Sequence, residues 1–413
     1  LSALGGCELR SSRYLALTPF ERPDRRLAQA LARFGVAAAV DYGRASTDQA
    51  LALEILAETP RLGLRIPEGV SSRNVTLPPH LAFLIVNDDY AEWRRTASCP
   101  VVAQVVSVEE ATAALAARVD GLIVKGQESG GRVGAESAFV LLQRVIALAA
   151  LNDALVWCQG GIGLHTAAAA LVGGAHGVVL DAQLAGLPEC SLPDALKAQV
   201  LAMDGSEVRE VAGYQVYARP GPETAALEGA TLDAVRARLA GEGEPLWPIG
   251  QDAAFARALV AECPTLETLL KTLDTRIAAQ LMQAKKLEAL AEGNPWARAH
   301  GTRYPIAQGP MTRVSDTADF CGAVADAGAL PFLALSLMKA DASKKLLEET
   351  RVRVAGKPWG VGVLGFAAPE ILEPQLALIH EFRPSVVLLA GGRPSQARPL
   401  IDAGIPTYLH VPS

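Results

Sequence analysis

The chain has 413 residues, of which 50% are hydrophobic, 5% aromatic and 20% charged, a composition that supports a sizeable core and excludes a disordered or coiled-coil chain. Its 38 basic and 44 acidic residues leave a net charge of −6. Lys and Arg form no cluster, which argues against a nucleic acid or an anionic membrane as partner. No apolar run reaches the roughly 20 residues that a bilayer span needs.

The first part of the chain alternates short apolar segments with amphipathic helical segments. The apolar segments are continuous, which is typical of parallel strands buried on both faces. Expected strands are 13–20, 36–43, 61–69, 79–88, 100–107, 120–127, 154–162 and 175–183, and expected helices are 24–35, 47–59, 107–119, 137–151 and 164–174. This alternation predicts an α/β fold, a (β/α)8 TIM-type barrel over residues 1–190. The polar connection 70–78 is too short for a helix, so one helix of the ring is expected to be missing there.

Residues 191–300 break this rhythm and are interpreted as a connecting region. A short pair of strands is expected within 204–223, and most of 224–300 is expected to be helical. A long amphipathic pattern over 266–293 ends at Gly293-Asn294-Pro295, where a helix should stop. We expect this helix to pack on the barrel flank; a helix that forms a homodimer is the alternative.

The alternation resumes over residues 301–413. Expected strands are 303–311, 329–335, 357–366, 384–392 and 405–413, and expected helices are 316–328, 341–356, 369–382 and 394–404. The segment PTYLHVPS at 406–413 matches PVVAQVVS at 100–107, which indicates an internal repeat. The repeat predicts the first five strands of a second, truncated barrel. Five strands leave open sheet edges, so we expect the natural polypeptide to continue beyond Ser413 or to pair with another chain.

Glycine-rich loops follow the sixth and seventh expected strands of the first barrel. In (β/α)8 barrels the functional site lies at the carboxyl ends of the strands, and the loops after strands seven and eight commonly hold a phosphate. Those loops are 159–163 and 180–186, and the loop after strand six is 125–134. Because glycine lets the backbone approach a ligand closely, these loops predict a phosphate-bearing ligand. Glycines required only by tight turns remain the alternative.

The order of strand, GQESGGRVG loop, helix, strand, GGIG loop, helix and strand, with QGPM at a strand end in the second copy, resembles the nitronate monooxygenase (2-nitropropane dioxygenase-like) family. The FMN-dependent enoyl reductases of fatty acid synthesis share that family's fold. The resemblance covers the first barrel and the five strands of the second copy. It implies FMN as cofactor, NAD(P)H as electron donor, and either enoyl-thioester reduction or nitronate-type oxidation.

The resemblance also implies roles for particular residues. In the second copy the segment along the flavin ring is Gln308, Gly309, Pro310 and Met311; the first copy has Thr18, Pro19 and Phe20 instead. The first-barrel residues implied to contact the cofactor are Gln127, Gly130, Gly131, Gly160, Gly161, Ile162 and Asp181. Arg132 stands where the family has its catalytic His, and His410 lies at a barrel-mouth position, so both are the candidate catalytic residues.

Two of these positions depart from the family pattern. Arg132 stays cationic and cannot act as a base near neutral pH, whereas His can. Asp181 and Ala182 replace a Gly-Thr pair, and a carboxylate beside a phosphate dianion is repulsive unless Arg132, Lys125 or a cation intervenes. The first barrel is therefore interpreted as a degenerate copy. A non-catalytic scaffold or docking module is the alternative function.

A second resemblance concerns the segments 177–186 and 203–220. They resemble the region at the front of type I polyketide and polyunsaturated fatty acid synthase-like megasynthases. This implies acyl-thioester substrates and a carrier domain or other downstream synthase domains as partners. A cytoplasmic location is expected separately, because the six scattered cysteines are typical of thiols in a reducing compartment.

A dinucleotide-binding fold is the remaining alternative. Gly160, Gly161 and Gly163 follow a strand, and Asp181 comes 18 residues after Gly163, which imitates the fingerprint of NAD(P)-binding domains. Thr166, however, occupies the place of the third glycine, and six strands precede the motif. The six cysteines show no metal-ligand spacing. We therefore expect no metal site, and we expect the cysteines to be reduced thiols.

Overall fold

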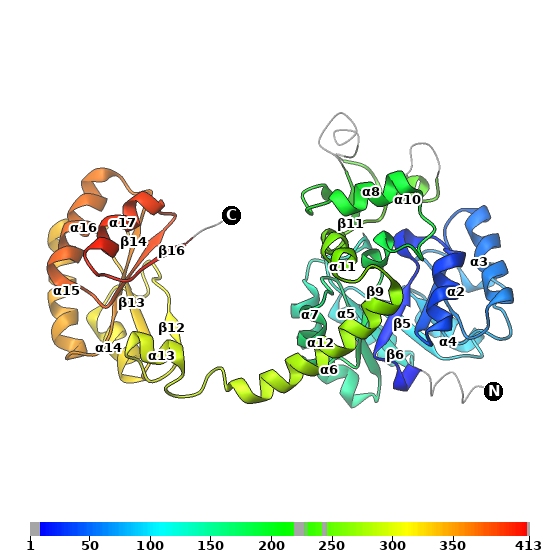
Figure 1. Ribbon diagram of the computed structural model, residues 1–413, viewed down its shortest axis with the longest axis horizontal. Coiled ribbons are helices and arrows are strands. Elements are labelled where there is room, and N and C mark those ends of the chain that lie inside the picture. The colour runs from blue at the N-terminus through cyan, green and yellow to red at the C-terminus, as the bar shows by residue number, and fades with distance from the viewer. Residues whose placement is uncertain (1–8, 219–226, 228, 242–245, 411–413) are drawn as a thin grey trace. The chain divides into compact units, whose positions relative to one another are not determined.

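The computed structural model describes residues 9–218, 227, 229–241 and 246–410. The chain divides into two compact units, Leu1–Gln283 and Ala284–Ser413 (Figure 1). The predicted fold is confirmed: a closed eight-stranded parallel barrel is followed by a helical region and a five-stranded parallel half-barrel. Residues 191–283 of the expected connecting region belong to the first unit, and 284–300 belong to the second.

The barrel of the first unit closes because its first strand pairs in parallel with both the second strand and the last. Its strands, in order around the barrel, are β1 Tyr14–Leu17, β2 Ala37–Asp41, β3 Gly63–Arg65, β4 Leu84–Val86, β5 Val101–Val105, β6 Gly121–Lys125, β8 Leu155–Gln159 and β9 Gly177–Leu180. A layer of apolar side chains, including Leu15, Ile85, Val102 and Trp157, fills the interior. The carboxyl ends of the strands carry polar side chains instead, and these form the site described below.

Helices cover the outside of the barrel, and α2, α5 and α6 begin at a residue whose side chain caps the helix. They are α2 Arg25–Arg33, α3 Ser46–Glu58, α4 Tyr90–Thr96, α5 Val108–Ala116, α6 Ala138–Leu151 and α7 Thr166–Val172. Asp24 and Ser107 cap α2 and α5 by accepting the N–H groups of Leu27 and Glu110, which satisfies donors at the helix start. Between β3 and β4 the described chain has only a 3-10 turn, Ser72–Asn74. This is the place where the sequence predicts that one helix of the ring is missing.

The rest of the first unit packs on this barrel. It contains η3 Ala182–Gly186, α8 Asp194–Ala202, β10 Val208–Val211, β11 Tyr214–Tyr217, α10 Leu232–Leu239, η4 Gln251–Phe255, α11 Ala256–Glu262 and α12 Leu266–Leu287. The β10–β11 hairpin extends to β7, Gly131–Arg132, in a small antiparallel sheet. Leu266, Leu269, Leu273 and Ile277 of α12 are buried in the barrel core, so this helix packs on the barrel flank as expected.

The second unit is a parallel sheet with helices between its strands. The strands are β12 Ala307–Gln308, β13 Leu330–Ala334, β14 Gly360–Leu364, β15 Val386–Ala390 and β16 Thr407–His410, and the helices are α13 Pro295–His300, α14 Ala318–Asp326, α15 Ala340–Val354, α16 Pro369–Phe382 and α17 Pro394–Asp402. In Figure 1, α15 and α16 cover one face of this sheet. Pro100 and Pro406 each precede the fifth strand of their unit, as the repeat predicts.

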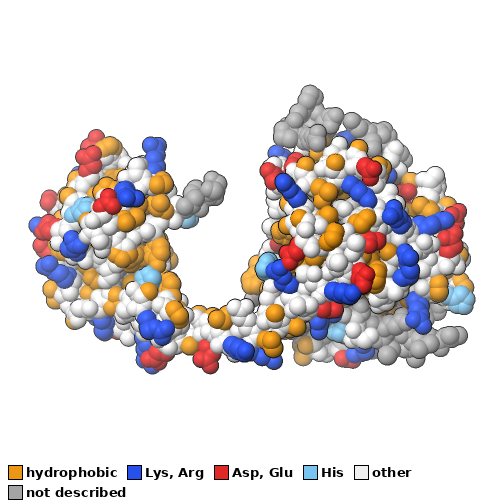
Figure 2. All heavy atoms as spheres, in the orientation of Figure 1, with side chains coloured by type: hydrophobic (Ala, Val, Ile, Leu, Met, Phe, Trp, Pro, Cys, Tyr) orange, Lys and Arg blue, Asp and Glu red, His pale blue; other side chains and the backbone are white. Residues whose placement is uncertain are grey.

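Charged side chains of both signs are interspersed over the face of each unit shown in Figure 2. Among the described helices, none combines the length and the apolar character that crossing a bilayer requires. The cysteines at 99, 158, 190, 263 and 321 are buried free thiols; Cys7 lies outside the described residues. No cluster of three or more His, Cys, Asp or Glu with the geometry of a metal site occurs in the described part of the chain.

Candidate functional site

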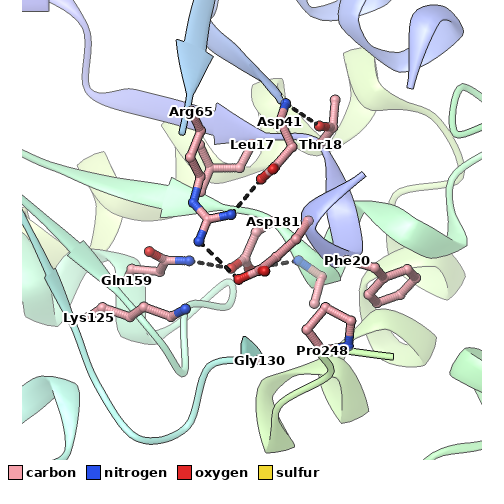
Figure 3. Close-up of a pocket in the computed structure, with 12 residues that line it drawn as sticks. Leu17, Thr18, Phe20, Asp41, Arg65, Lys125, Gly130, Gln159, Asp181 and Pro248 are labelled. Atoms are coloured by element: carbon pink, nitrogen blue, oxygen red, sulfur yellow. Dashed lines mark hydrogen bonds and ion pairs between the residues drawn. The ribbon is translucent and has the colours of Figure 1, made fainter. Parts of the chain in front are cut away.

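Arg65 stands at the centre of the carboxyl end of the first barrel, where its side chain is buried with two carboxylates (Figure 3). Its guanidinium pairs with Asp41 at 2.5 Å (Nη1 to Oδ2) and with Glu21 at 3.0 Å (Nη2 to Oε1). Arg65 Nε also donates to Oε1 of Gln104 at 3.1 Å. A buried guanidinium needs such partners, because an unpaired buried charge is strongly unfavourable.

The hydrogen bonds continue from Arg65 to the last strand of the barrel. Gln104 Nε2 donates to Oε1 of Gln159 at 2.5 Å, and Gln159 Nε2 donates to Oδ2 of Asp181 at 2.5 Å. The other oxygen of Asp181 accepts the N–H of Ala182 at 2.7 Å. One connected network therefore joins the ends of β2, β3, β5, β8 and β9 across the barrel; we call it the mouth network.

Burial and neighbouring charges shift the pKa values of ionisable side chains in the barrel mouth. Burial raises the pKa of Glu21, but the positive charges of Arg65, Arg44 and Lys125 outweigh it and bring the pKa to about 2. Burial and the neighbouring Arg65 lower the pKa of Lys125 to about 8. Burial also raises the pKa of Asp181, against the opposing effect of its hydrogen bond from Gln159. Glu21 is thus held ionised in the barrel mouth.

Little space remains at the strand ends. The cavity there has a volume of about 20 Å³ and is lined by Thr18, Glu21, Asp41, Arg65, Lys125 and Asp181, among others. One water needs roughly 10–15 Å³ of such volume, so this cavity has room for about one water. FMN does not fit the first barrel as these residues stand.

The segment after β1 explains part of this closure. Phe20 and Glu21 both adopt left-handed backbone angles, with φ of 63° and 54°, which is uncommon for residues with side chains. Phe20 is buried and packs edge-on against Trp247 at 6.0 Å between ring centroids, while the Glu21 carboxylate reaches Arg65. The first-copy counterpart of the expected ring-side segment therefore fills the mouth with its own side chains.

A second segment, Pro248–Phe255, closes the mouth over the loop that follows β6. Asp252 N–H donates to the carbonyl of Glu128 at 3.1 Å. The two backbones touch so closely that a Cβ on Gly130 would lie 2.2 Å from the carbonyl oxygen of Pro248, and a Cβ on Gly250 would lie 2.2 Å from that of Glu128. Glycine is required at both positions by this contact, rather than by a ligand.

The predicted catalytic Arg132 lies in β7, and its guanidinium is engaged with two carboxylates. Arg132 Nε pairs with Glu68 at 2.5 Å, and its terminal nitrogens pair with Glu110. Glu68 is also bound by Arg236 of α10 and by the hydroxyl of Tyr214 in β11. The structure places Arg132 in a clamp between the barrel and the β10–β11 hairpin, and it is not among the residues that line the mouth cavity.

The predicted cofactor-binding residues of the first barrel lie around the mouth, with different surroundings. Gly130 and Asp181 line the cavity. Gly131 is buried in β7, and a Cβ there would lie 2.5 Å from Oε1 of Glu21. Gln127 donates its N–H to Glu136, which ties the β6 loop together. Gly160, Gly161 and Ile162 form the turn after β8.

The second unit carries its predicted segment at an accessible strand end. Gln308 ends β12 and its Oε1 accepts the N–H of Phe332, while the N–H of Met311 donates to Ser315. A Cβ on Gly309 would have no atom within 4 Å. Pro310 packs against Gly362 of β14. This segment therefore lies open at the strand end rather than in a closed network.

Exposed apolar side chains surround that segment. Met311, Leu337 and Phe366 follow β12, β13 and β14, and they are 42%, 66% and 72% exposed. The predicted catalytic His410 is exposed in β16, paired with Ala390. In the aligned repeat it occupies the position that Gln104 holds in β5, and Gln104 belongs to the mouth network. His410 belongs to the second unit, whereas the candidate residues of the first barrel belong to the first unit.

The sequence pattern did not single out six residues of the site, which are Glu21, Asp41, Arg65, Gln104, Gln159 and Asp252. One signal was present: Asp41 and Arg65 are charges inside apolar runs expected to be strands. A charge at the end of a buried parallel strand points to a network at the barrel mouth. Asp252 carries no comparable signal, because its segment lies far along the chain from the barrel strands.

Comparisons with known proteins support the barrel fold. A scan against protein-family models finds no match. FabK from Thermotoga maritima has a TM-score of 0.53 and 16% identity, covering 68% of this chain and 97% of FabK. The enoyl reductase domain of MlnA from the macrolactin biosynthesis cluster of Bacillus amyloliquefaciens has a TM-score of 0.51 and 10% identity, covering 69% of this chain and 99% of that domain.

A curated protein is similar in sequence to part of the chain. It is a (3aS,4S,5R,7aS)-5-hydroxy-7a-methyl-1-oxo-octahydro-1H-indene-4-carboxyl-CoA dehydrogenase of Mycobacterium tuberculosis, 28% identical over 180 residues, or 42% of this chain. The chain spans about half (49%) of the length of that relative.

The dinucleotide-binding alternative is wrong. It requires an open, doubly wound sheet that begins with the glycine-rich turn, whereas that turn follows the seventh strand of a closed barrel. Asp181, which would bind a ribose in that fold, is instead held by Gln159 and Ala182.

Proposed function

We propose that this chain is part of a flavin-dependent oxidoreductase that acts on acyl thioesters. In this proposal the second unit supplies the ring side of the flavin site, and the first unit is a non-catalytic barrel that serves as scaffold. The names of two similar proteins support the substrate class. One is a dehydrogenase of a carboxyl-CoA compound and the other is an enoyl reductase domain of a macrolactin cluster.

The observation that carries the proposal is the contrast between the two strand-end surfaces. The mouth of the first barrel is filled by the network around Arg65 and has space for about one water. The second unit presents Gly309 and the exposed side chains of Met311, Leu337 and Phe366. Apolar surface with a few backbone groups is what a planar ring and an acyl chain require.

In the second unit, the residues of 308–311 would hold FMN by its ring, and bound FMN would supply the hydride chemistry. The chain's own part is to bind and orient. Gln308 is held by its contact with Phe332, which keeps the strand end in place. Because Gly309 has no side chain, the backbone there can approach a flat ligand closely. The apolar side chains exclude water from an acyl chain laid across them.

The wider setting belongs to the same proposal. An acyl thioester delivered by a carrier domain, within a polyketide or fatty acid synthase-like assembly, fits the enoyl reductase domain among the similar structures. Nitronate-type oxidation would use the same surface with a small carbanion in place of the thioester. The exposed apolar side chains of Met311, Leu337 and Phe366 favour the larger acyl substrate.

Hydrogen exchange on the full chain tests this assignment. FMN, an acyl-CoA, or both are added to the chain. We expect the ligand to slow the exchange of backbone amides at 309–315 and 336–338, and to leave the exchange around 125–134 and 159–163 unchanged. Gly309→Val should remove that protection, and its space is free of other atoms. Protection confined to the first barrel, or a complete absence of protection in the second unit, would overturn the proposal. The absorbance of bound flavin at about 450 nm gives an independent measure of FMN binding.

A further inference from the structure

Hydrogen-bond donors without acceptors gather in the first barrel at the ends of β6 and β8. Lys125, the last residue of β6, is 2% exposed, lines the mouth cavity, and makes no hydrogen bond or ion pair with the described residues. The hydroxyl of Ser129 is fully buried and has no partner within the described chain. Ser129 Oγ lies 3.1 Å from where a Cβ on Gly160 would be, so it faces the turn after β8.

That turn adds backbone donors. Gly160 and Gly161 have φ of 108° and 64°, a conformation in which glycine carries little cost. The N–H groups of Gly160 and Ile162 donate to no backbone carbonyl among the described residues. The turn follows the seventh barrel strand, and with the loop after the eighth it forms the place where barrels of this type bind a phosphate. An ammonium, a hydroxyl and free N–H groups together are the chemistry of an anion site.

A carboxyl group from a distant part of the chain lies against these donors. Asp252 of η4 is 1% exposed, and neither of its side-chain oxygens makes a hydrogen bond of normal geometry within the described residues. Burial, followed by the charge of Asp181, raises its pKa well above the usual value, while Lys125 and the N–H of Gly161 act in the opposite direction. Ala253 of η4 packs with Ala182 and Ala185 of η3, and the Asp252 N–H donates to Glu128 in the loop after β6. This packing places the carboxyl group beside the loops after β6 and β9, next to the turn after β8.

We propose that the Asp252 carboxyl group occupies, from within the chain, the place that a phosphate group of a ligand takes in such a barrel. The contact of Pro248–Phe255 with the β6 loop holds it there, through the Asp252 N–H to Glu128. The phosphate position of the first barrel is thus filled by a residue of the same chain. The inference rests on the proposal that the first unit binds no flavin, and it adds the residue responsible and the class of ligand excluded, a phosphate or phosphate monoester.

Charge and space both contribute to the exclusion of phosphate from this position. A phosphate dianion entering here would displace Asp252 and would meet the carboxylates of Asp181 and Glu128, which lie near enough to influence the protonation of Asp252. Like charges at such range in a buried site repel strongly. A carboxyl group that stays neutral fills the space without that repulsion.

Inorganic phosphate tests the inference on the full chain. Asp252→Ala should create an anion site, seen as a saturable rise of about 2 °C in the Tm of the first unit with phosphate relative to chloride at equal ionic strength. Asp181→Asn combined with Asp252→Ala should enlarge that rise by removing a repelling charge. Asp252→Asn keeps the volume filled and should show no phosphate-dependent rise, like the wild type.

Gln251→Ala is the matched control, because its side chain is exposed next to Asp252. Circular dichroism on each variant establishes that the barrel is folded. Asp252→Ser, which also removes the carboxyl group, replaces Asp252→Ala if the Ala variant does not fold. The inference is overturned if the Ala and double variants respond no more than Gln251→Ala, if the wild type responds equally, or if the Asn variant gains the site. Since the ligand carries no flavin, this result is independent of the flavin and acyl-CoA measurements.

Discussion

At the carboxyl ends of their strands, the two units differ in kind although they repeat the same alternation of strands and helices. In the first unit the strand ends carry Asp41, Arg65, Lys125 and Gln159, all buried. In the second unit the loops after β12, β13 and β14 expose Met311, Leu337 and Phe366. A shared topology therefore does not produce a shared surface, because the loops and strand ends can change while the strand interiors keep their packing.

Closure of the barrel accounts for much of the difference. Gln159 and Asp181 come from the end of the seventh strand and from the residue after the eighth strand of the first barrel. They complete the hydrogen-bond network that begins at Arg65. The second unit has five strands in the described chain. Gln104 and His410 illustrate the effect: the first is enclosed by Arg65 and Gln159, and the second is exposed in β16. The following predictions test how far this contrast extends.

The largest effect is expected from Arg65→Ala. Removing the guanidinium leaves Asp41 buried without its cation and leaves Glu21 with only the longer contact to Arg44 at 3.5 Å. This should lower the free energy of unfolding of the first unit by about 3–5 kcal/mol. Denaturant unfolding measures the loss, and the transition of the second unit should be unchanged. Arg26→Ala, at an exposed position of α2, is the control. An equal effect of both changes would show that the network contributes no special stability.

Acid should destabilise the first unit. The pKa of Glu21 is about 2 in the folded chain, below its ordinary value of 4.5. Its contribution to stability is therefore complete above about pH 4.5 and is lost as the pH falls towards 2. The shift corresponds to about 3 kcal/mol. Unfolding measured across this window should show a pH dependence that Glu21→Gln reduces; an unchanged profile in the variant would contradict the assignment.

A smaller effect is expected from Arg132→Ala. This change leaves Glu68 and Glu110 without their shared partner and should cost about 1–3 kcal/mol. Hydrogen exchange should increase mainly in β10 and β11, because Tyr214 and Arg236 share Glu68 with Arg132. Arg132→Lys should recover only part of the loss, since a lysine cannot pair with both carboxylates as a guanidinium does. Unchanged exchange in the hairpin would argue against the clamp.

The smallest effect on stability is expected from Phe366→Ala. Its side chain is 72% exposed, so unfolding should change by no more than about 0.5 kcal/mol. Acyl-CoA binding should nevertheless weaken several-fold if this surface holds the acyl chain. Val352→Ala, 79% exposed on α15, provides a control of similar exposure. Equal acyl-CoA affinity in wild type and Phe366→Ala would place the acyl site elsewhere.

The sequence by itself determined the barrel, the repeat and the position of the glycine-rich loops. Continuous apolar runs separated by amphipathic helices leave few topologies other than a parallel barrel. The order of elements was therefore predictable from local patterns. Capping residues such as Asp24 and Ser107 were equally readable, since a cap depends on its nearest neighbours.

Only the tertiary structure decided what the mouth of the first barrel contains. Glu21 and Arg65 are 44 residues apart, and Arg65 and Gln104 are 39 apart, and their contact exists only because the strands close into a ring. Asp252 contacts the loop after β6 from outside the barrel strands altogether, through its N–H to Glu128. Local patterns carry no information about such pairs, because the geometry that joins them is set by the curvature of the barrel and the return of η4 to its mouth.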